Sequence, residues 1–229
     1  MENYLSLLEA NPLFDSISRE DLPNLLHCLQ ARERSYAKGE VLFAEGQTIS
    51  QLGVIISGRV NTVYDDLFGN RSILGVMEAG QLFCDAFCCA SDNRAPVSVT
   101  AQTECRALLI QAELVLHTCA HSCRQHQRLA ENLVHILADK YLAQSRKMIH
   151  LSEKTTRQKL LSYLSEQLRR AGGNPFPLPF NRQELADYLF VDRSGLSVQW
   201  NLLKKQGILQ EHQGLCSLHP GPRPAALDR

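Results

Sequence analysis

The sequence has no apolar run that approaches the roughly 18 residues of a membrane span. It has no net charge, because 24 Lys and Arg balance 24 Asp and Glu. Its first residues, MENYLSLLEANPLF, carry an acidic residue where a secretion signal needs a basic region. These absences argue against a membrane or secreted protein and predict a cytoplasmic one. The eight cysteines are then expected to be free thiols rather than a disulfide framework.

Histidine is absent between residues 28 and 116. A cupin-like metal enzyme built on strands in this region would need two or three histidines there. The sequence also lacks a Gly-rich phosphate loop between a strand and a helix, and it lacks a nucleophile elbow. We therefore do not expect an enzyme.

Charge is divided unequally along the chain. Residues 1–149 carry 13 Lys and Arg against 17 Asp and Glu, whereas residues 150–229 carry 11 against 7. A basic C-terminal part suits contact with DNA.

The N-terminal part predicts short helices followed by a β-roll. Residues 2–31 hold short apolar runs at helical spacing. From residue 36 to 110 glycine recurs between short apolar stretches such as EVLFAE and LGVIIS, a pattern typical of an antiparallel roll or jelly roll. Such a roll can hold a small molecule in its interior. We assign residues 1–123 to this effector-sensing domain.

Residues 124–150 predict one long helix with two apolar stripes. The first stripe has the 4-and-3 spacing of a heptad seam and consists of Ala130, Val134, Leu137, Tyr141, Gln144, Met148 and Leu151. The second stripe consists of Leu129, Leu133 and Ile136. Two stripes favour two contacts, one with a partner helix and one with the helix's own roll. The alternative is one wide stripe packed inside a monomer.

Residues 151–229 form a second predicted domain. Asn181, with Glu184 three residues further on, marks a helix start of the capping-box type, and Asp192 can cap the next helix. The buried side of this second helix consists of Leu196, Trp200 and Leu203. Two short helices joined by a tight turn indicate a helix-turn-helix, and GILQEHQGLCSL after them predicts a hairpin wing.

In this order, KGEVLFAEGQ, SGRVNTVYDDLFGNRSILGVMEAGQLF and FNRQELADYLFVDRSGLS resemble the bacterial Crp/Fnr transcription regulators along nearly the whole chain. The resemblance implies an α+β protein with an N-terminal β-roll of cyclic-nucleotide-binding type, a long dimerisation helix and a C-terminal winged helix-turn-helix. It implies a homodimer on a near-palindromic double-stranded DNA operator, controlled by an effector at the roll. RNA polymerase is a further candidate partner, and no membrane partner is expected.

The resemblance also implies an effector pocket, to which we assign Phe83, Cys84, Asp85, Arg94, Val97 and Tyr141. Members that bind cyclic AMP have a Gly-Glu pair where this chain has Cys84-Asp85. Their phosphate-binding Arg falls on Ala95, and Arg94 lies one residue early. Cyclic AMP is therefore not expected. An iron–sulfur cluster is not expected either, because only Cys28 precedes the roll. The effector could be a small molecule, a redox signal or a metal.

For the DNA surface, the resemblance selects Gln183, Arg193, Ser194, Ser197, Val198 and Asn201. Val198 stands where members usually carry an Arg that holds guanine. Arg193 is then the best base-reading candidate, with a phosphate contact as the alternative. A ligand- or metal-sensing dimer that has lost specific DNA recognition is the alternative function.

The cysteines leave alternatives open. Cys84, Cys88 and Cys89 can serve as small apolar packing residues of the pocket wall, or as a redox-sensing thiol activated by Arg94. Within HTCAHSCRQH, the candidate metal ligands are His117, Cys119, His121 and Cys123. The alternative for this segment is a short helix that docks small apolar residues on the roll.

Overall fold

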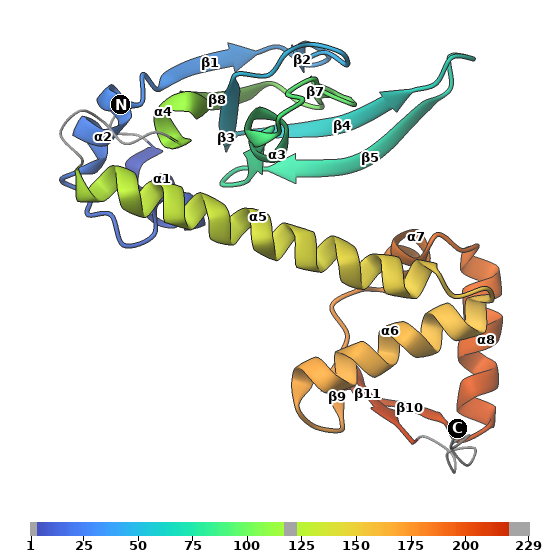
Figure 1. Ribbon diagram of the computed structural model, residues 1–229. Coiled ribbons are helices and arrows are strands. Elements are labelled where there is room, and N and C mark those ends of the chain that lie inside the picture. The colour runs from blue at the N-terminus through green and yellow to red at the C-terminus, as the bar shows by residue number, and fades with distance from the viewer. Residues whose placement is uncertain (1–3, 117–122, 220–229) are drawn as a thin grey trace, which may run out of the picture. The chain divides into compact units, whose positions relative to one another are not determined.

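The computed structural model describes residues 4–116 and 123–219 (Figure 1). The chain divides into two compact units, with the division between Asp139 and Lys140 inside the long helix α5, Arg124–Leu151. The architecture is the predicted α+β fold, with antiparallel sheets in the first unit and a helical domain with a small sheet in the second. None of the helices in the described parts of the chain is both long and apolar enough to cross a membrane.

The first unit begins with short helices and continues as a roll of two antiparallel sheets. The helices are α1 (Leu5–Glu9), the 3-10 helix η2 (Pro12–Phe14), α2 (Leu22–Cys28), α3 (Asp85–Cys89) and α4 (Ala112–Leu116). One sheet has the order β1-β8-β3-β6, with bounds Arg32–Tyr36, Cys105–Gln111, Gln51–Ser57 and Leu82–Phe83. The other has the order β2-β7-β4-β5, with bounds Val41–Phe43, Ser98–Ala101, Arg59–Asp65 and Arg71–Glu78.

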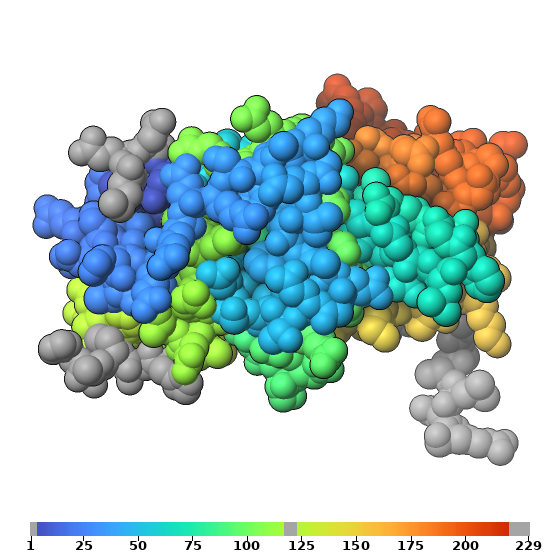
Figure 2. Space-filling view, turned by 90° about the horizontal axis from the view of Figure 1, so that it is seen from above, coloured from blue at the N-terminus to red at the C-terminus, as the bar shows by residue number. Residues whose placement is uncertain are grey.

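Two apolar cores hold the first unit together. One fills the inside of the roll and includes Tyr36, Phe43 and Phe83. The other lies between the roll and the N-terminal helices, and it includes Leu129 and Leu133 from α5. Both leucines are fully buried, which confirms that the second predicted stripe of the long helix packs on its own chain. The β4–β5 hairpin belongs to the exposed surface of this unit, teal in Figure 2.

In residues 140–219, the second unit contains the C-terminal part of α5, three further helices and a three-stranded sheet. The helices are α6 (Thr156–Ala171), α7 (Arg182–Leu189) and α8 (Arg193–Lys205). The sheet has the order β10-β11-β9, with bounds Leu209–His212, Leu215–Leu218 and Phe176–Pro177. Its β10–β11 hairpin is the predicted wing.

Candidate effector and DNA-binding sites

The wall of the roll at α3 is built around two unusual backbone positions. Gly53 pairs with Phe83 across the sheet, and a Cβ at Gly53 would overlap the Phe83 ring, so glycine is required there. Cys84 adopts the left-handed conformation, with φ 59°, directly before α3. This conformation is strained for a residue with a side chain. The side chains of Phe83, Cys84 and Asp85 are all buried.

Backbone hydrogen bonds of Ala95 leave the neighbouring Arg94 side chain outside the roll interior. The Ala95 N–H donates to the Gln47 carbonyl at 2.9 Å, and the Ala95 carbonyl accepts from the Gly46 N–H at 2.8 Å. These bonds fix the backbone so that Ala95 lies in the same core as Phe83 and Cys84, whereas the Arg94 side chain is exposed. Of the other predicted pocket residues, Val97 is buried, and Tyr141 lies in the second unit with 72% of its surface exposed.

The thiols of α3 interact with each other rather than with Arg94. Cys88 Sγ lies 3.8 Å from Cys89 Sγ, and the Cys88 thiol is also 3.3 Å from the Asp85 carbonyl oxygen. The hydrogen bond with the Cys88 thiol lowers the pKa of Cys89, and the same contact together with burial raises the pKa of Cys88. These contacts give no support to the sequence-based idea that Arg94 activates a thiol, because the neighbour that shifts the pKa of each thiol most is the adjacent cysteine.

The predicted metal cluster lies mostly outside the described residues, since His117, Cys119 and His121 are not described. Cys123 is described, and its Sγ lies 2.8 Å from Nδ1 of His126. Burial lowers the pKa of His126, which favours the neutral imidazole. Among residues 4–116 and 123–219, no group of three or more His, Cys, Asp and Glu side chains has an arrangement that could hold a metal ion.

The helix-turn-helix is defined by its caps. The Asn181 side chain accepts from the backbone N–H groups of Gln183 and Glu184, and the Glu184 carboxylate accepts from the Asn181 N–H at 2.8 Å. This is the predicted capping box. Phe190 ends α7 in the left-handed conformation, and the Asp192 side chain then caps α8 by accepting from the Gly195 N–H at 2.7 Å.

Helix α8 buries one face and exposes the other. Leu196, Trp200 and Leu203 lie in the core of the second unit, as predicted. The predicted DNA-contacting side chains Arg193, Ser194, Val198 and Asn201 are exposed, and Ser197 is half-buried. Sequence reasoning thus placed the faces of this helix correctly.

Some of the predicted DNA-contacting side chains already form hydrogen bonds within the chain. Ser197 Oγ donates to the Arg193 carbonyl at 2.9 Å, and the Ser194 hydroxyl donates to the Asp192 carboxylate. Gln183, exposed on α7, donates to Asp187 at 2.9 Å. Arg193 forms no ion pair with any residue in the described ranges, so its guanidinium is available.

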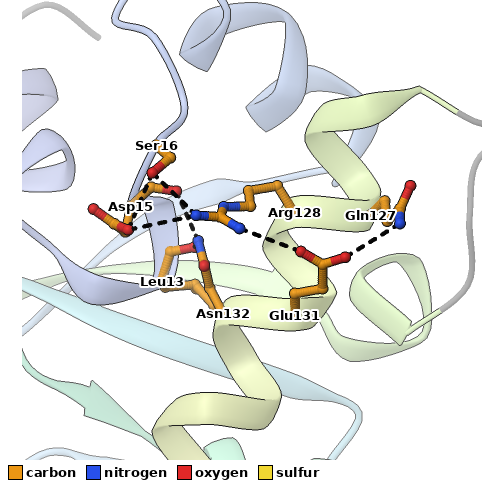
Figure 3. Close-up of polar contacts among 7 residues, drawn as sticks. All are labelled: Leu13, Asp15, Ser16, Gln127, Arg128, Glu131 and Asn132. Carbon is orange, nitrogen blue, oxygen red and sulfur yellow. Dashed lines mark hydrogen bonds and ion pairs between the residues drawn. The ribbon is translucent and has the colours of Figure 1, made fainter.

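A polar cluster that sequence reasoning missed attaches the start of α5 to the N-terminal segment (Figure 3). The buried Asn132 Nδ2 donates to the Leu13 carbonyl at 3.0 Å and to the Asp15 carbonyl at 2.9 Å. Arg128 donates to Ser16 Oγ at 3.2 Å and pairs with Glu131 at 3.4 Å. Asn132 is a polar residue beside an apolar stripe, which is the signal that could have identified it.

A second missed pair lies in the second unit. His150, the penultimate residue of α5, is buried, and its Nε2 lies 2.5 Å from Oε2 of Glu166 on α6. Its Nδ1 lies 2.8 Å from Ser162 Oγ. Two polar contacts of the His150 ring thus link the end of α5 to α6 within this unit.

The sequence is similar to that of known proteins along nearly its whole length. The cyclic nucleotide-binding domain family matches residues 33–122. The cyclic AMP receptor protein of Thermus thermophilus is 25% identical over 221 residues, which cover 96% of each chain. The transcriptional activator protein FnrL of Cereibacter sphaeroides is 24% identical over 77% of this chain and 71% of its own.

Among solved structures, the Thermus thermophilus catabolite activator protein superposes with a TM-score of 0.54 at 22% identity. The match covers 91% of this chain and 94% of the other. This likeness shows the same fold. The curated relatives are transcription regulators and not enzymes, in agreement with the sequence analysis. Residues 33–122 thus match the cyclic nucleotide-binding domain family, and in its long helix and its C-terminal helix-turn-helix the chain resembles the Crp/Fnr transcription regulators.

Proposed function

We propose that the protein is a homodimeric, sequence-specific DNA-binding regulator controlled by an effector at its β-roll. The observation that carries the proposal is α8, which exposes Arg193, Ser194 and Asn201 on one face and is held by a buried face. We assign sensing to residues 1–123, dimerisation to 124–150 and DNA binding to 151–229. A regulator of this kind acts on the bacterial chromosome, and hence in the cytoplasm. Contact with RNA polymerase stays a prediction.

The exposed stripe of α5 supports the dimer. Val134, Tyr141 and Met148 lie seven residues apart, and their side chains are 61%, 72% and 69% exposed. Leu137, between them, is half-buried against the core of the first unit. Apolar side chains at heptad spacing on an open helix face are the seam of a two-helix coiled coil. We therefore place the second copy against this stripe.

The roll supports an effector other than cyclic AMP. A cyclic nucleotide needs a cation for its phosphate, yet Ala95 lies at the buried position and the Arg94 side chain is exposed. Phe43 and Phe83, with ring centroids 6.0 Å apart, fill part of the interior. These residues do not fit cyclic AMP, and the effector classes that stay open are a small molecule, a metal and a redox signal.

Two sets of variants test the proposal. Val134→Glu and Tyr141→Glu place charges in the seam, and sedimentation should show monomers, whereas Arg128→Glu outside the seam should leave the dimer intact. Dimers that persist in both seam variants would contradict the assigned interface.

To test DNA reading, the wild-type dimer first selects an operator from random DNA. The DNA affinities of Arg193→Ala and Arg193→Lys are then compared on single-base variants of that operator. A bidentate guanine contact contributes about 1–3 kcal/mol of discrimination, so both variants should flatten the preference at one base pair in each half-site. A uniform loss of affinity with Ala and recovery with Lys would instead identify a phosphate contact. Absence of any preferred sequence for the wild type would favour the alternative of a sensing dimer without specific DNA recognition.

A further inference from the structure

Two adjacent cysteines end α3 in the first unit. Cys88 and Cys89 are both half-buried, and their sulfur atoms lie 3.8 Å apart. A disulfide needs sulfurs about 2 Å apart, so closing one requires rotation of both side chains and a change of the backbone at the end of the helix. Both residues lie in the last turn of the helix, which ends at Ala90 in extended conformation, so the backbone there has fewer helical hydrogen bonds to break.

The two thiols differ in the way that a reactive pair requires. The hydrogen bond with Cys88 lowers the pKa of Cys89 and stabilises its thiolate. The same hydrogen bond raises the pKa of Cys88, as do burial and the nearby Cys84 and Asp85, so Cys88 stays a thiol that can donate a proton. The thiolate is the nucleophile in thiol oxidation. Cys89 is therefore the thiol that reacts first, and Cys88 is the one that resolves.

We propose that Cys88 and Cys89 form a hydroperoxide-sensing dithiol that closes to a disulfide between adjacent residues. The chemistry is independent of the proposed function, and only its role in controlling DNA binding rests on that function. The Cys89 thiolate attacks one oxygen of hydrogen peroxide, the O–O bond breaks, and the released hydroxide takes a proton to give water and a sulfenic acid. The Cys88 sulfur then attacks the Cys89 sulfur. The S–S bond forms, the sulfenic oxygen takes the Cys88 proton, and a second water leaves.

The product is a strained disulfide. Adjacent Cα atoms are about 3.8 Å apart across a trans peptide, whereas disulfide-linked Cα atoms usually lie about 4.4–6.8 Å apart. Strained disulfides are reduced more readily than structural ones and serve regulatory roles. The dithiol should therefore cycle with cellular thiols rather than remain oxidised.

The position of the pair couples it to the long helix. Cys88 and Cys89 pack against the core that contains Leu129 and Leu133 of α5, and Cys88 also contacts the core inside the roll. Closing the disulfide changes the side-chain directions of both residues and removes the contact of the Cys88 thiol with the Asp85 carbonyl. Packing of the first half of α5 against the roll should change with it.

Peptide mass spectrometry of the full-length protein tests the chemistry without DNA. After brief treatment with hydrogen peroxide and alkylation, the peptide with Cys88 and Cys89 should lack both alkyl groups and be lighter than the reduced peptide by two hydrogen atoms. A thiol reductant should restore both alkylation sites. Cys88→Ser should instead leave a sulfenic acid at Cys89 that dimedone traps, and Cys28→Ser, at an exposed cysteine, should oxidise as the wild type does. A pair that stays alkylatable, or that reaches sulfinic acid without a disulfide, would overturn the proposal.

Hydrogen exchange tests the coupling. Oxidation of the wild type should increase amide exchange in α3 and in residues 124–139, and it should have no such effect in Cys89→Ser. Unchanged exchange despite a formed disulfide would overturn the link to α5. Neither result depends on an operator, so failure of the DNA-binding proposal is recognised separately, by the absence of a preferred DNA sequence.

Discussion

Replacing Asn132 should loosen the attachment of α5 to the N-terminal segment. The buried Asn132 amide donates to the carbonyl oxygens of Leu13 and Asp15 at 3.0 and 2.9 Å. A hydrogen bond contributes about 1 kcal/mol net, so Asn132→Ala should lower the free energy of unfolding by about 2 kcal/mol. Asn132→Asp should cost more, because a carboxylate has no N–H to donate and brings a charge against two carbonyl oxygens.

Urea unfolding followed by far-UV circular dichroism measures both variants. All samples are compared at one protein concentration, because subunit association adds to apparent stability. Asn201→Ala, on the exposed face of α8, is the matched control and should change the free energy of unfolding by less than about 0.5 kcal/mol. The reasoning is refuted if Asn132→Ala behaves like the control, or if the Asp variant is no less stable than the Ala variant.

Three further predictions concern single positions. Gly53→Ala should destabilise the roll by about 1–3 kcal/mol in urea unfolding, because its Cβ overlaps the Phe83 ring, and Phe83→Leu should restore part of this loss; no loss in the single variant would contradict the described contact. Asn181→Ala removes the cap of α7 and should lower the free energy of unfolding by about 1 kcal/mol, with a loss of DNA affinity in a binding titration; an unchanged midpoint would show that the cap is dispensable. The pKa of His126 is lowered in the folded protein, so the unfolded chain binds a proton first and stability should fall as the pH falls below about 6.5. His126→Gln should reduce that dependence, and equal slopes in both proteins would contradict the buried neutral imidazole.

Local patterns predicted the parts of this fold that local chemistry determines. The capping box at Asn181 and Glu184 forms both of its hydrogen bonds, and the long helix begins and ends within one residue of its predicted bounds. The apolar face with Leu196 and Trp200 followed from helical spacing alone. These features depend on residues that are close in sequence, so their geometry is fixed by the period of the helix.

Contacts between distant segments could not be predicted in the same way. Asn132 and Leu13 are 119 residues apart, and nothing in either local pattern indicates that one donates to the other. The Arg94 side chain lies outside the roll because backbone pairing with residues 46–49 sets the direction of its loop. The sulfur contact of Cys88 and Cys89 likewise depends on their side-chain directions at the end of α3 and on packing against two cores.

Selection of bound sequences from a random DNA pool by the purified protein tests the central claim most directly. The selection is run on reduced protein, on peroxide-treated protein and on protein with added zinc. The account predicts an enriched motif with two-fold symmetry, whose half-sites are centred about one helical turn of DNA apart or a multiple of it, and whose enrichment differs between the reduced and oxidised states. A motif without symmetry, or no enrichment in any of the three conditions, would contradict it.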